Sequence, residues 1–332
     1  MSLSYKISPY FQDLQLYVGQ QLDYKSASNT INKLLLNAQS DDSQIHRLCT
    51  HYGDLLEISE VVQQAEQNPQ AEENNQEQPI TYVGVDGHFL LTDDGWQEVK
   101  LGRLFSSNDI VYGHPSPDIE RVRNQIQHSN YLAHHGHCDQ FKEKFDRLLE
   151  DYLSKEQNPK TKMVLLSDGA IWIDNWQKSH QIEWTSILDY YHVTEKLHEI
   201  ANLFLTKAKK TSWVEQNCKL LLEGGWDDVL EKIINLESKN TDKLEKRDNL
   251  VKHFRKNRKR MDYQSFLEEG LYIGSGFIES AHKFVVQKRM KLSGQRWGNG
   301  IQGMLDLRCC SQSNKWGKVV GIIKNECFKI AG

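Results

Sequence analysis

The spacing of apolar residues over the first 60 positions predicts helices. Leucine, isoleucine and aromatic side chains recur three or four residues apart, which places them on one face of a helix. Residues 26–36 and 41–56 form two such helices in this interpretation, with a short connection between them and Asp41 as the N-cap of the second. The pair has the size of a helix-turn-helix, although any small helical hairpin gives the same pattern.

From position 81 onward the pattern changes to strands. Residues 81–91 and 96–105 are two β-rich runs, and Asp94-Gly95 between them is a hairpin signal. The elements that follow are a weaker third strand around Tyr131, a helix over 141–153, and two short apolar strands at 163–166 and 185–188 with a helical piece between them. This order predicts an α/β domain with a mixed sheet. Residues 193–268 then have helical spacing throughout.

Composition describes a globular chain. Of the 332 residues, 38% are hydrophobic and 26% are charged, which suffices for more than one core. No run approaches the roughly 18 apolar residues of a membrane span, and the first residues lack the apolar stretch of a secretory signal. We therefore expect a cytoplasmic protein. The six cysteines are scattered without zinc-type pairs, so free thiols are expected.

Charge is distributed unevenly along the chain. Residues 1–205 hold 16 Lys and Arg against 30 Asp and Glu, a balance of −14, whereas residues 206–332 hold 25 against 15, a balance of +10. An excess of positive charge suits contact with a polyanion such as DNA, and is also common on solvated helices.

Three acids occupy positions where chemistry is common. Asp86 lies inside the first predicted strand, where a turn at Asp86-Gly87 is the structural alternative. Asp168 directly follows the apolar strand at 163–166, where ligands and metals collect in open α/β sheets, although it could also cap the next helix. Glu279 stands in the first turn of a helix, where it could instead compensate the helix dipole.

Together these acids predict a metal site. Three carboxylates brought close together repel one another unless a divalent cation neutralises them. Ligands that are all oxygen favour Mg²⁺ or Mn²⁺ over zinc. Two such ions about 3.5–4 Å apart support phosphodiester chemistry.

Six segments, in order, resemble those of the ISKra-type insertion-sequence DDE transposases. They are YVGVDG at 82–87, GWQEVK at 95–100, SDGAIWI at 167–173, ILDYYH at 187–192, IGSGFIES at 273–280 and RMKLSGQRW at 289–297. The resemblance covers roughly residues 80–310. It implies a ribonuclease-H-like catalytic domain with a mostly helical insertion, in which Asp86, Asp168 and Glu279 are the catalytic acids and hold two Mg²⁺ or Mn²⁺ ions.

The second acid has an alternative. Asp189 also follows a strand, and the segment from Asp189 to His192 is similar to an Asp/Cys-x-x-His motif of related transposases. A ribonuclease-H-like order places the second acid after the fourth strand, which favours Asp168. Asp189 and His192 are then expected to orient neighbouring groups or a DNA strand, or to form a buried hydrogen-bonded pair.

The apolar spacing of residues 1–59, the Gln-, Asn- and Glu-rich composition of residues 60–80 and the resemblance over the rest of the chain together set the expected domain organisation. A helical, helix-turn-helix-like DNA-binding segment is expected at 1–59, followed by a polar linker at 60–80. The catalytic domain is expected in two parts, at 81–192 and at 271–332, and the second part carries the glutamate helix and a C-terminal helix. A basic helical insertion at 193–270 separates the two parts.

Cations close to these motifs are candidates for DNA contact. Six Lys or Arg occur among the nine residues 252–260, and a second basic stretch follows Glu279, where Trp297 could stack on bases or simply pack in the core. The candidate DNA-binding residues are Lys252, Arg255, Lys256, Arg258, Lys259, Arg260, Lys283, Lys288, Arg289, Lys291, Arg296 and Trp297. The cluster from His134 to Cys138 lacks a second ligand pair at zinc spacing, so a structural or exposed role is expected there.

The sequence thus predicts a DDE transposase that binds the double-stranded ends of an insertion element and joins them to target DNA. Because the reaction joins two ends, a homo-oligomer is expected, associated with the nucleoid when bound to DNA. The rival hypotheses are a transposase-derived DNA-binding protein without transposition activity and a nuclease that cleaves without joining.

Overall fold

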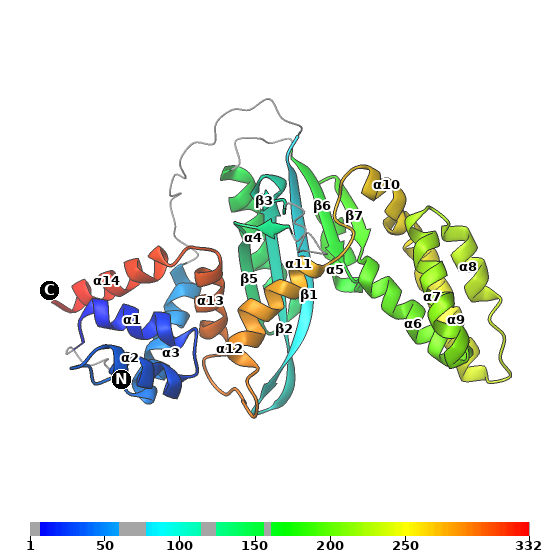
Figure 1. Ribbon diagram of the computed structural model, residues 1–332. Coiled ribbons are helices and arrows are strands. Elements are labelled where there is room, and N and C mark those ends of the chain that lie inside the picture. Colours follow the sequence, from blue (N-terminus) through cyan, green and yellow to red (C-terminus); the bar gives the residue numbers. More distant parts are fainter. Residues whose placement is uncertain (1–6, 60–77, 114–123, 156–160, 332) are drawn as a thin grey trace. The chain divides into compact units, whose positions relative to one another are not determined.

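A computed structural model describes residues 7–59, 78–113, 124–155 and 161–331. The linker predicted at 60–80 therefore lies almost entirely outside the described residues. The described part is mixed α/β, and its main sheet has five strands in the order β5-β2-β1-β6-β7 (Figure 1). The chain divides into two compact units: Met1–Thr81, Val85–Thr161 and Ile278–Gly332 make up the first, and Tyr82–Gly84 and Lys162–Phe277 the second.

The predicted hairpin is confirmed. Gly95 has a φ of 98°, which glycine adopts without steric cost, and the Thr92 hydroxyl donates to the Gly95 carbonyl at 2.8 Å across the turn. The weak third strand is also present, antiparallel to the second with Val99 opposite His135, whereas the last two strands are parallel. The bounds of the main sheet are β1 (Ile80–Thr92), β2 (Gly95–Ser106), β5 (Asn130–His135), β6 (Lys162–Ser167) and β7 (Trp184–Leu188).

Helices of the first unit come from both ends of the chain. The predicted cap at Asp41 is confirmed, since its carboxylate accepts the Gln44 N–H at 2.8 Å. The two predicted N-terminal helices are present, and the first of them is shifted by two residues relative to the prediction. The helices are α1 (Pro9–Gly19), α2 (Tyr24–Leu34), α3 (Asp42–Ser59), α4 (Cys138–Lys155), α11 (Gly276–Ala281), α12 (Lys288–Met290), α13 (Ile301–Gln312) and α14 (Gly317–Ala331).

Smaller elements complete the first unit. A π-helical turn, η3 (His282–Gln287), joins α11 to α12. The 3₁₀ turn η1 (Ser107–Asp109) precedes the short pair β3 (Ile110–Val111) and β4 (Gln125–Ile126).

The second unit carries the predicted helical stretch. Met163, Val164, Leu165 and Leu166 are buried, as their apolar sequence predicts for an inner strand. Helices α6 to α9 lie side by side beyond the strands (Figure 1). The helices are α5 (Ile171–Lys178), α6 (Tyr190–Phe204), α7 (Lys207–Leu222), α8 (Trp226–Ile234), α9 (Thr241–Lys256) and α10 (Tyr263–Glu268), with the 3₁₀ turn η2 (Arg258–Met261).

Among the described residues, none of the helices combines the length and the apolar content needed to cross a bilayer.

Candidate active site

Asp86 lies within β1 rather than in a turn. Its neighbours Val83 and Val85 are buried, but the side chain of Asp86 is 36% exposed. Its Oδ1 accepts the N–H of Gly87 at 2.8 Å, and its Oδ2 lies 3.3 Å from Nε2 of His282. The carboxylate is therefore held at the sheet surface with access to solvent, which a cation ligand requires.

Glu279 lies on α11, one helical turn before His282. Residues three apart share a helix face, so the contact between His282 and Asp86 brings the helix of Glu279 against the strand of Asp86 within the first unit. Glu279 itself is exposed. The first unit thus supplies two of the three predicted acids from two elements in contact.

Asp168 belongs to the second unit, directly after β6. Its Oδ1 accepts the Ala170 N–H at 2.9 Å, so it forms a local turn. The N-cap position of α5 is Ala170, and no side chain caps that helix. Asp168 therefore does not cap this helix.

Asp189 is buried and saturated with hydrogen bonds. It caps α6 by accepting the N–H groups of Tyr191 and His192 at 3.1 and 3.3 Å, and it accepts the N–H and hydroxyl of Ser275 at 3.0 and 2.6 Å. Its exposure is 6%. Asp189 thus ties the start of α6 to the loop before α11. It bonds to the backbone of His192, whose ring lies instead 3.8 Å from Glu195.

One compact group of metal-type side chains stands out in the described part of the chain, and it is not the predicted set of acids. His137, Cys138 and Asp139 place their ligand atoms within 4.8 Å of one another at the start of α4. His137 and Asp139 are 73% and 70% exposed, and Asp139 also pairs with Lys142 at 3.1 Å. Within the histidine cluster, for which a structural or exposed role is expected, His137 is thus exposed, whereas His134 is 5% exposed.

The structure corrects two of the predicted DNA contacts. Arg289 and Trp297 are 1% and 5% exposed. The guanidinium of Arg289 lies between the rings of Tyr24 and Trp297, 4.5 and 5.2 Å from their centroids, and donates to the Gly19 carbonyl. The Trp297 indole donates to the Met290 carbonyl at 2.9 Å. Both side chains therefore belong to the core.

Two further cations, in the basic run at 252–260, are partly buried and contact other side chains. Arg260 pairs with Asp174 at 2.7 Å and donates to the Ser167 hydroxyl at 2.7 Å, and Arg258 stacks on the Trp226 ring at 4.6 Å. Burial lowers the pKa of Arg260, while the charges of Asp174 and Asp168 act in the opposite direction. The predicted contacts that remain exposed are Lys252, Arg255, Lys256, Lys259, Lys283, Lys288, Lys291 and Arg296.

The sequence interpretation missed two histidines beside Asp86. His88 lies two residues further along β1 and therefore on the same face, and its ring centroid is 5.1 Å from that of His282. Lys291 lies 2.8 Å from Nε2 of His88. Burial lowers the pKa of His88, and nearby His282 and Lys291 add to this effect. His88 lies two residues after Asp86 on the strand, and His282 lies three residues after Glu279 on the helix. A search for polar residues at these spacings from the predicted acids finds both histidines.

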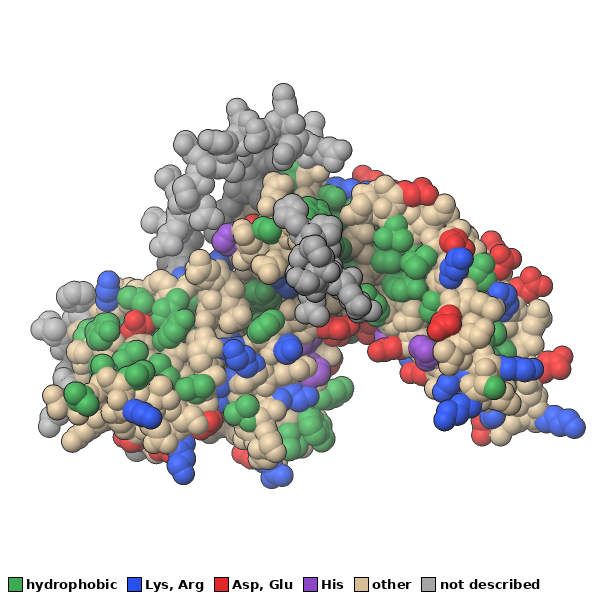
Figure 2. Space-filling model, viewed as in Figure 1, with side chains coloured by type: hydrophobic (Ala, Val, Ile, Leu, Met, Phe, Trp, Pro, Cys, Tyr) green, Lys and Arg blue, Asp and Glu red, His purple; other side chains and the backbone are tan. Residues whose placement is uncertain are grey.

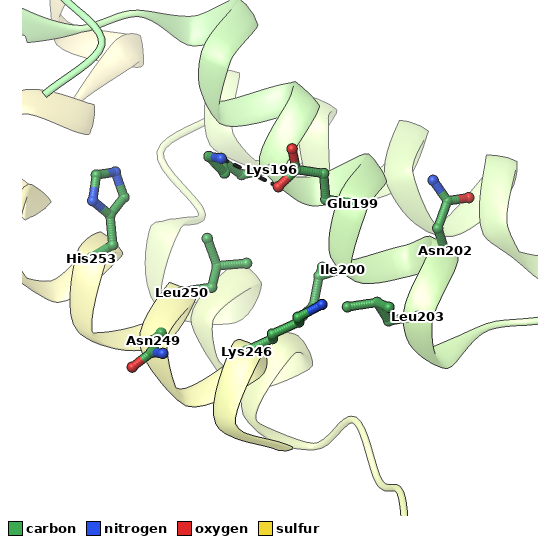
Figure 3. A pocket seen from close by; sticks show the side chains of 9 residues that line it. All are labelled: Lys196, Glu199, Ile200, Asn202, Leu203, Lys246, Asn249, Leu250 and His253. Carbon is green, nitrogen blue, oxygen red and sulfur yellow. Dashed lines mark hydrogen bonds and ion pairs between the residues drawn. The ribbon is translucent and has the colours of Figure 1, made fainter. Parts of the chain in front are cut away.

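A separate pocket of about 610 Å³ opens between α6 and α9 in the second unit (Figure 3). Apolar side chains of Ile200, Leu203 and Leu250 line it together with Lys246 and His253. The predicted acids are not among its lining residues.

Compared with known proteins, the chain matches no family model and no curated sequence.

Proposed function

We propose that the protein is a DDE transposase of the ISKra type that acts in the cytoplasm as a homo-oligomer on double-stranded DNA. The observation that carries the proposal is the contact within the first unit between the strand of Asp86 and the helix of Glu279, made at 3.3 Å through His282. It joins two of the motifs that underlie the resemblance, although these motifs lie far apart in the sequence.

The strand order supports a ribonuclease-H-like catalytic domain. The first strand of the hairpin lies at the centre of the sheet, with the second and third on one side and the fourth and fifth on the other. This is the arrangement expected of that fold, in which the second acid follows the fourth strand. Asp168 follows β6, the fourth strand of the main sheet.

Hydrogen bonding also favours Asp168 over Asp189. Asp189 already accepts four hydrogen bonds and is buried, so its oxygens are committed to the protein. Asp168 is partly exposed, and its Oδ1 accepts one hydrogen bond from the backbone. A carboxylate that binds a cation must be accessible to it, as the partly exposed Asp168 is and the buried Asp189 is not.

The donor chemistry of the proposed acids fits Mg²⁺ or Mn²⁺. Asp86, Asp168 and Glu279 offer carboxylate oxygens and no thiolate, which suits hard cations. When bound, two such ions would activate water or a 3′-hydroxyl and stabilise the leaving oxygen. The three acids would hold them, and no side chain needs to act as nucleophile.

The exposed cations support DNA binding. Lys283 and Lys288 lie on the same helical run as Glu279, where they can bind backbone phosphates and orient the DNA next to the acids. Lys252 and Arg255 are exposed near the end of α9, and Lys259 is exposed in the turn η2 that follows it. Figure 2 shows other Lys and Arg side chains, mixed with Asp and Glu, at the end of helices α6 to α9 that lies away from the strands.

The first prediction concerns Asp86→Ala. We expect cleavage of duplexes that carry the inverted repeats flanking the gene to fall by about 100-fold or more in Mg²⁺ or Mn²⁺, because several kcal/mol of charge stabilisation correspond to at least two powers of ten in rate. DNA binding should remain. Gel assays of nicked and strand-transfer products, with electrophoretic mobility shifts in parallel, measure both.

Asp94→Ala is the matched control, because it removes an exposed aspartate from the hairpin turn of the same unit. It should cleave as the unmodified protein does. Binding without nicking by the unmodified protein would instead support a DNA-binding protein without transposition activity, and nicking without strand transfer would support a nuclease.

A further inference from the structure

His282 is a buried polar side chain at the proposed active site. It is 2% exposed, and neither ring nitrogen makes a hydrogen bond to any residue that the structure describes. Its Nε2 faces Oδ2 of Asp86 at 3.3 Å. Burying an imidazole without a hydrogen bond is unfavourable compared with an apolar side chain, so packing alone does not account for a histidine at this position.

The backbone around His282 is unusual. The helix that begins at Gly276 changes to π-helical geometry at His282–Gln287 and returns to α-helix at Lys288. Such turns are rare and often mark functional sites, because they shift a helix face by part of a turn. Here the shift begins at the residue that meets Asp86.

A buried arginine maintains this turn. Arg308, on α13, is 0% exposed and donates to the carbonyls of Phe284 and Val285, which lie inside the π-helical turn. It also donates to the carbonyl and side chain of Gln20 at the end of α1. Desolvation lowers the pKa of Arg308 to about 10, so the side chain remains charged at neutral pH. The turn is thus fixed by a cation from another helix.

The neighbouring histidine has a different role. Lys291 lies 2.8 Å from Nε2 of His88, an arrangement in which the lysine donates to a neutral ring. His88 therefore has a donor already, whereas Nε2 of His282 faces the carboxylate of Asp86.

From this geometry we infer that His282 is a positioning residue for Asp86, and the inference rests on the proposed function. In this role an N–H at Nε2 donates to Oδ2 of Asp86, which lies 3.3 Å away, while the Gly87 N–H holds Oδ1. A carboxylate oxygen has two lone-pair directions, so each oxygen keeps one for the cation. The carboxylate is thereby held in one orientation before Mg²⁺ or Mn²⁺ binds, as supporting residues do at other metal sites.

The test compares two substitutions of His282. In His282→Gln the amide nitrogen can take the place of Nε2, whereas His282→Met has similar bulk and no donor. Supporting groups of this kind change metal affinity by about 10- to 100-fold. We therefore expect the dissociation constant for Mn²⁺, measured by electron paramagnetic resonance on the full chain, to rise about 10-fold or more in His282→Met. In His282→Gln it should stay within about 3-fold of the unmodified protein.

A spectroscopic measurement tests the same inference without metal. Ring nitrogen spectra of the ¹⁵N-histidine-labelled protein should show a proton on Nε2 of His282, and Asp86→Ala should shift this signal.

Val286→Ala is the control for destabilised packing, because Val286 is fully buried in the same π-helical turn. It should lower the melting temperature without changing Mn²⁺ affinity. Equal Mn²⁺ affinity in His282→Met and the unmodified protein overturns the inference and leaves the proposed function intact. A hyperfine coupling from the His282 nitrogen to bound Mn²⁺ also overturns it, because His282 would then be a ligand. Absence of Mn²⁺ binding by the unmodified protein counts against the proposed function itself.

Discussion

Two half-buried histidines illustrate how burial affects protonation at the scale of single residues. Burial lowers the pKa of His253, and the nearby charges of His192, Lys196, Lys256 and Arg260 lower it further. Burial also lowers the pKa of His135, and Lys100 adds to the effect. Both rings are therefore neutral in the folded protein at pH values where an ordinary histidine begins to bind a proton.

This leads to a prediction of pH dependence. The unfolded chain protonates these histidines near their ordinary pKa of 6.5, whereas the folded protein does so only at lower pH. The unfolded state then binds more protons, so the free energy of unfolding should decrease as the pH falls below about 6.5. Urea denaturation at pH 7.5 and 5.5 measures the change. His253→Gln should reduce it, while His137→Gln, which alters an exposed ring, should not.

At the scale of elements, the N-terminal helices are joined to the C-terminal ones by close packing. Helices α3 and α13 cross where Gly53 meets Gly303, and a Cβ atom on Gly53 would lie 2.3 Å from Cα of Gly303. Since neither backbone can move without disturbing its helix, the crossing requires glycine. The predicted N-terminal segment therefore packs within the first unit.

Gly53→Ala should accordingly destabilise the protein by about 1–3 kcal/mol, the usual cost of overpacking. Gly321→Ala on α14 is the matched control, because a Cβ atom there has nothing within 4 Å. The control should stabilise the protein by up to about 1 kcal/mol through helix propensity. Chemical denaturation of the two variants measures both effects, and equal stabilities would contradict the tight crossing.

At the scale of the whole molecule, the positive charge of the second half of the sequence is divided between exposed and buried positions. Lys252, Arg255 and Lys259 are exposed, whereas Arg289 and Arg308 are in the core. Only the exposed cations can release counterions from a DNA backbone. The balance of +10 for residues 206–332 therefore overstates the charge available to DNA.

Replacing Lys252, Arg255 and Lys259 together by alanine should weaken DNA binding equally for all sequences. The slope of log K against log salt should become shallower by up to about 0.9 for each phosphate that the variant no longer neutralises. Fluorescence anisotropy with labelled duplexes at several salt concentrations measures this slope. Removing the exposed or partly exposed Lys219, Lys232 and Lys239 is the control of equal charge. An equal change in both variants would mean that net charge alone governs binding.

Local patterns in the sequence determined the hairpin at Asp94-Gly95, the apolar strand β6 and the cap at Asp41, because each depends on residues within a few positions of one another. The predicted identity of the three acids also came from the sequence and stays a prediction. Tertiary structure alone decided that Trp297 is buried, that Ser275 saturates Asp189, and that His282 meets Asp86. These contacts join residues far apart in the chain, so neither periodicity nor composition encodes them.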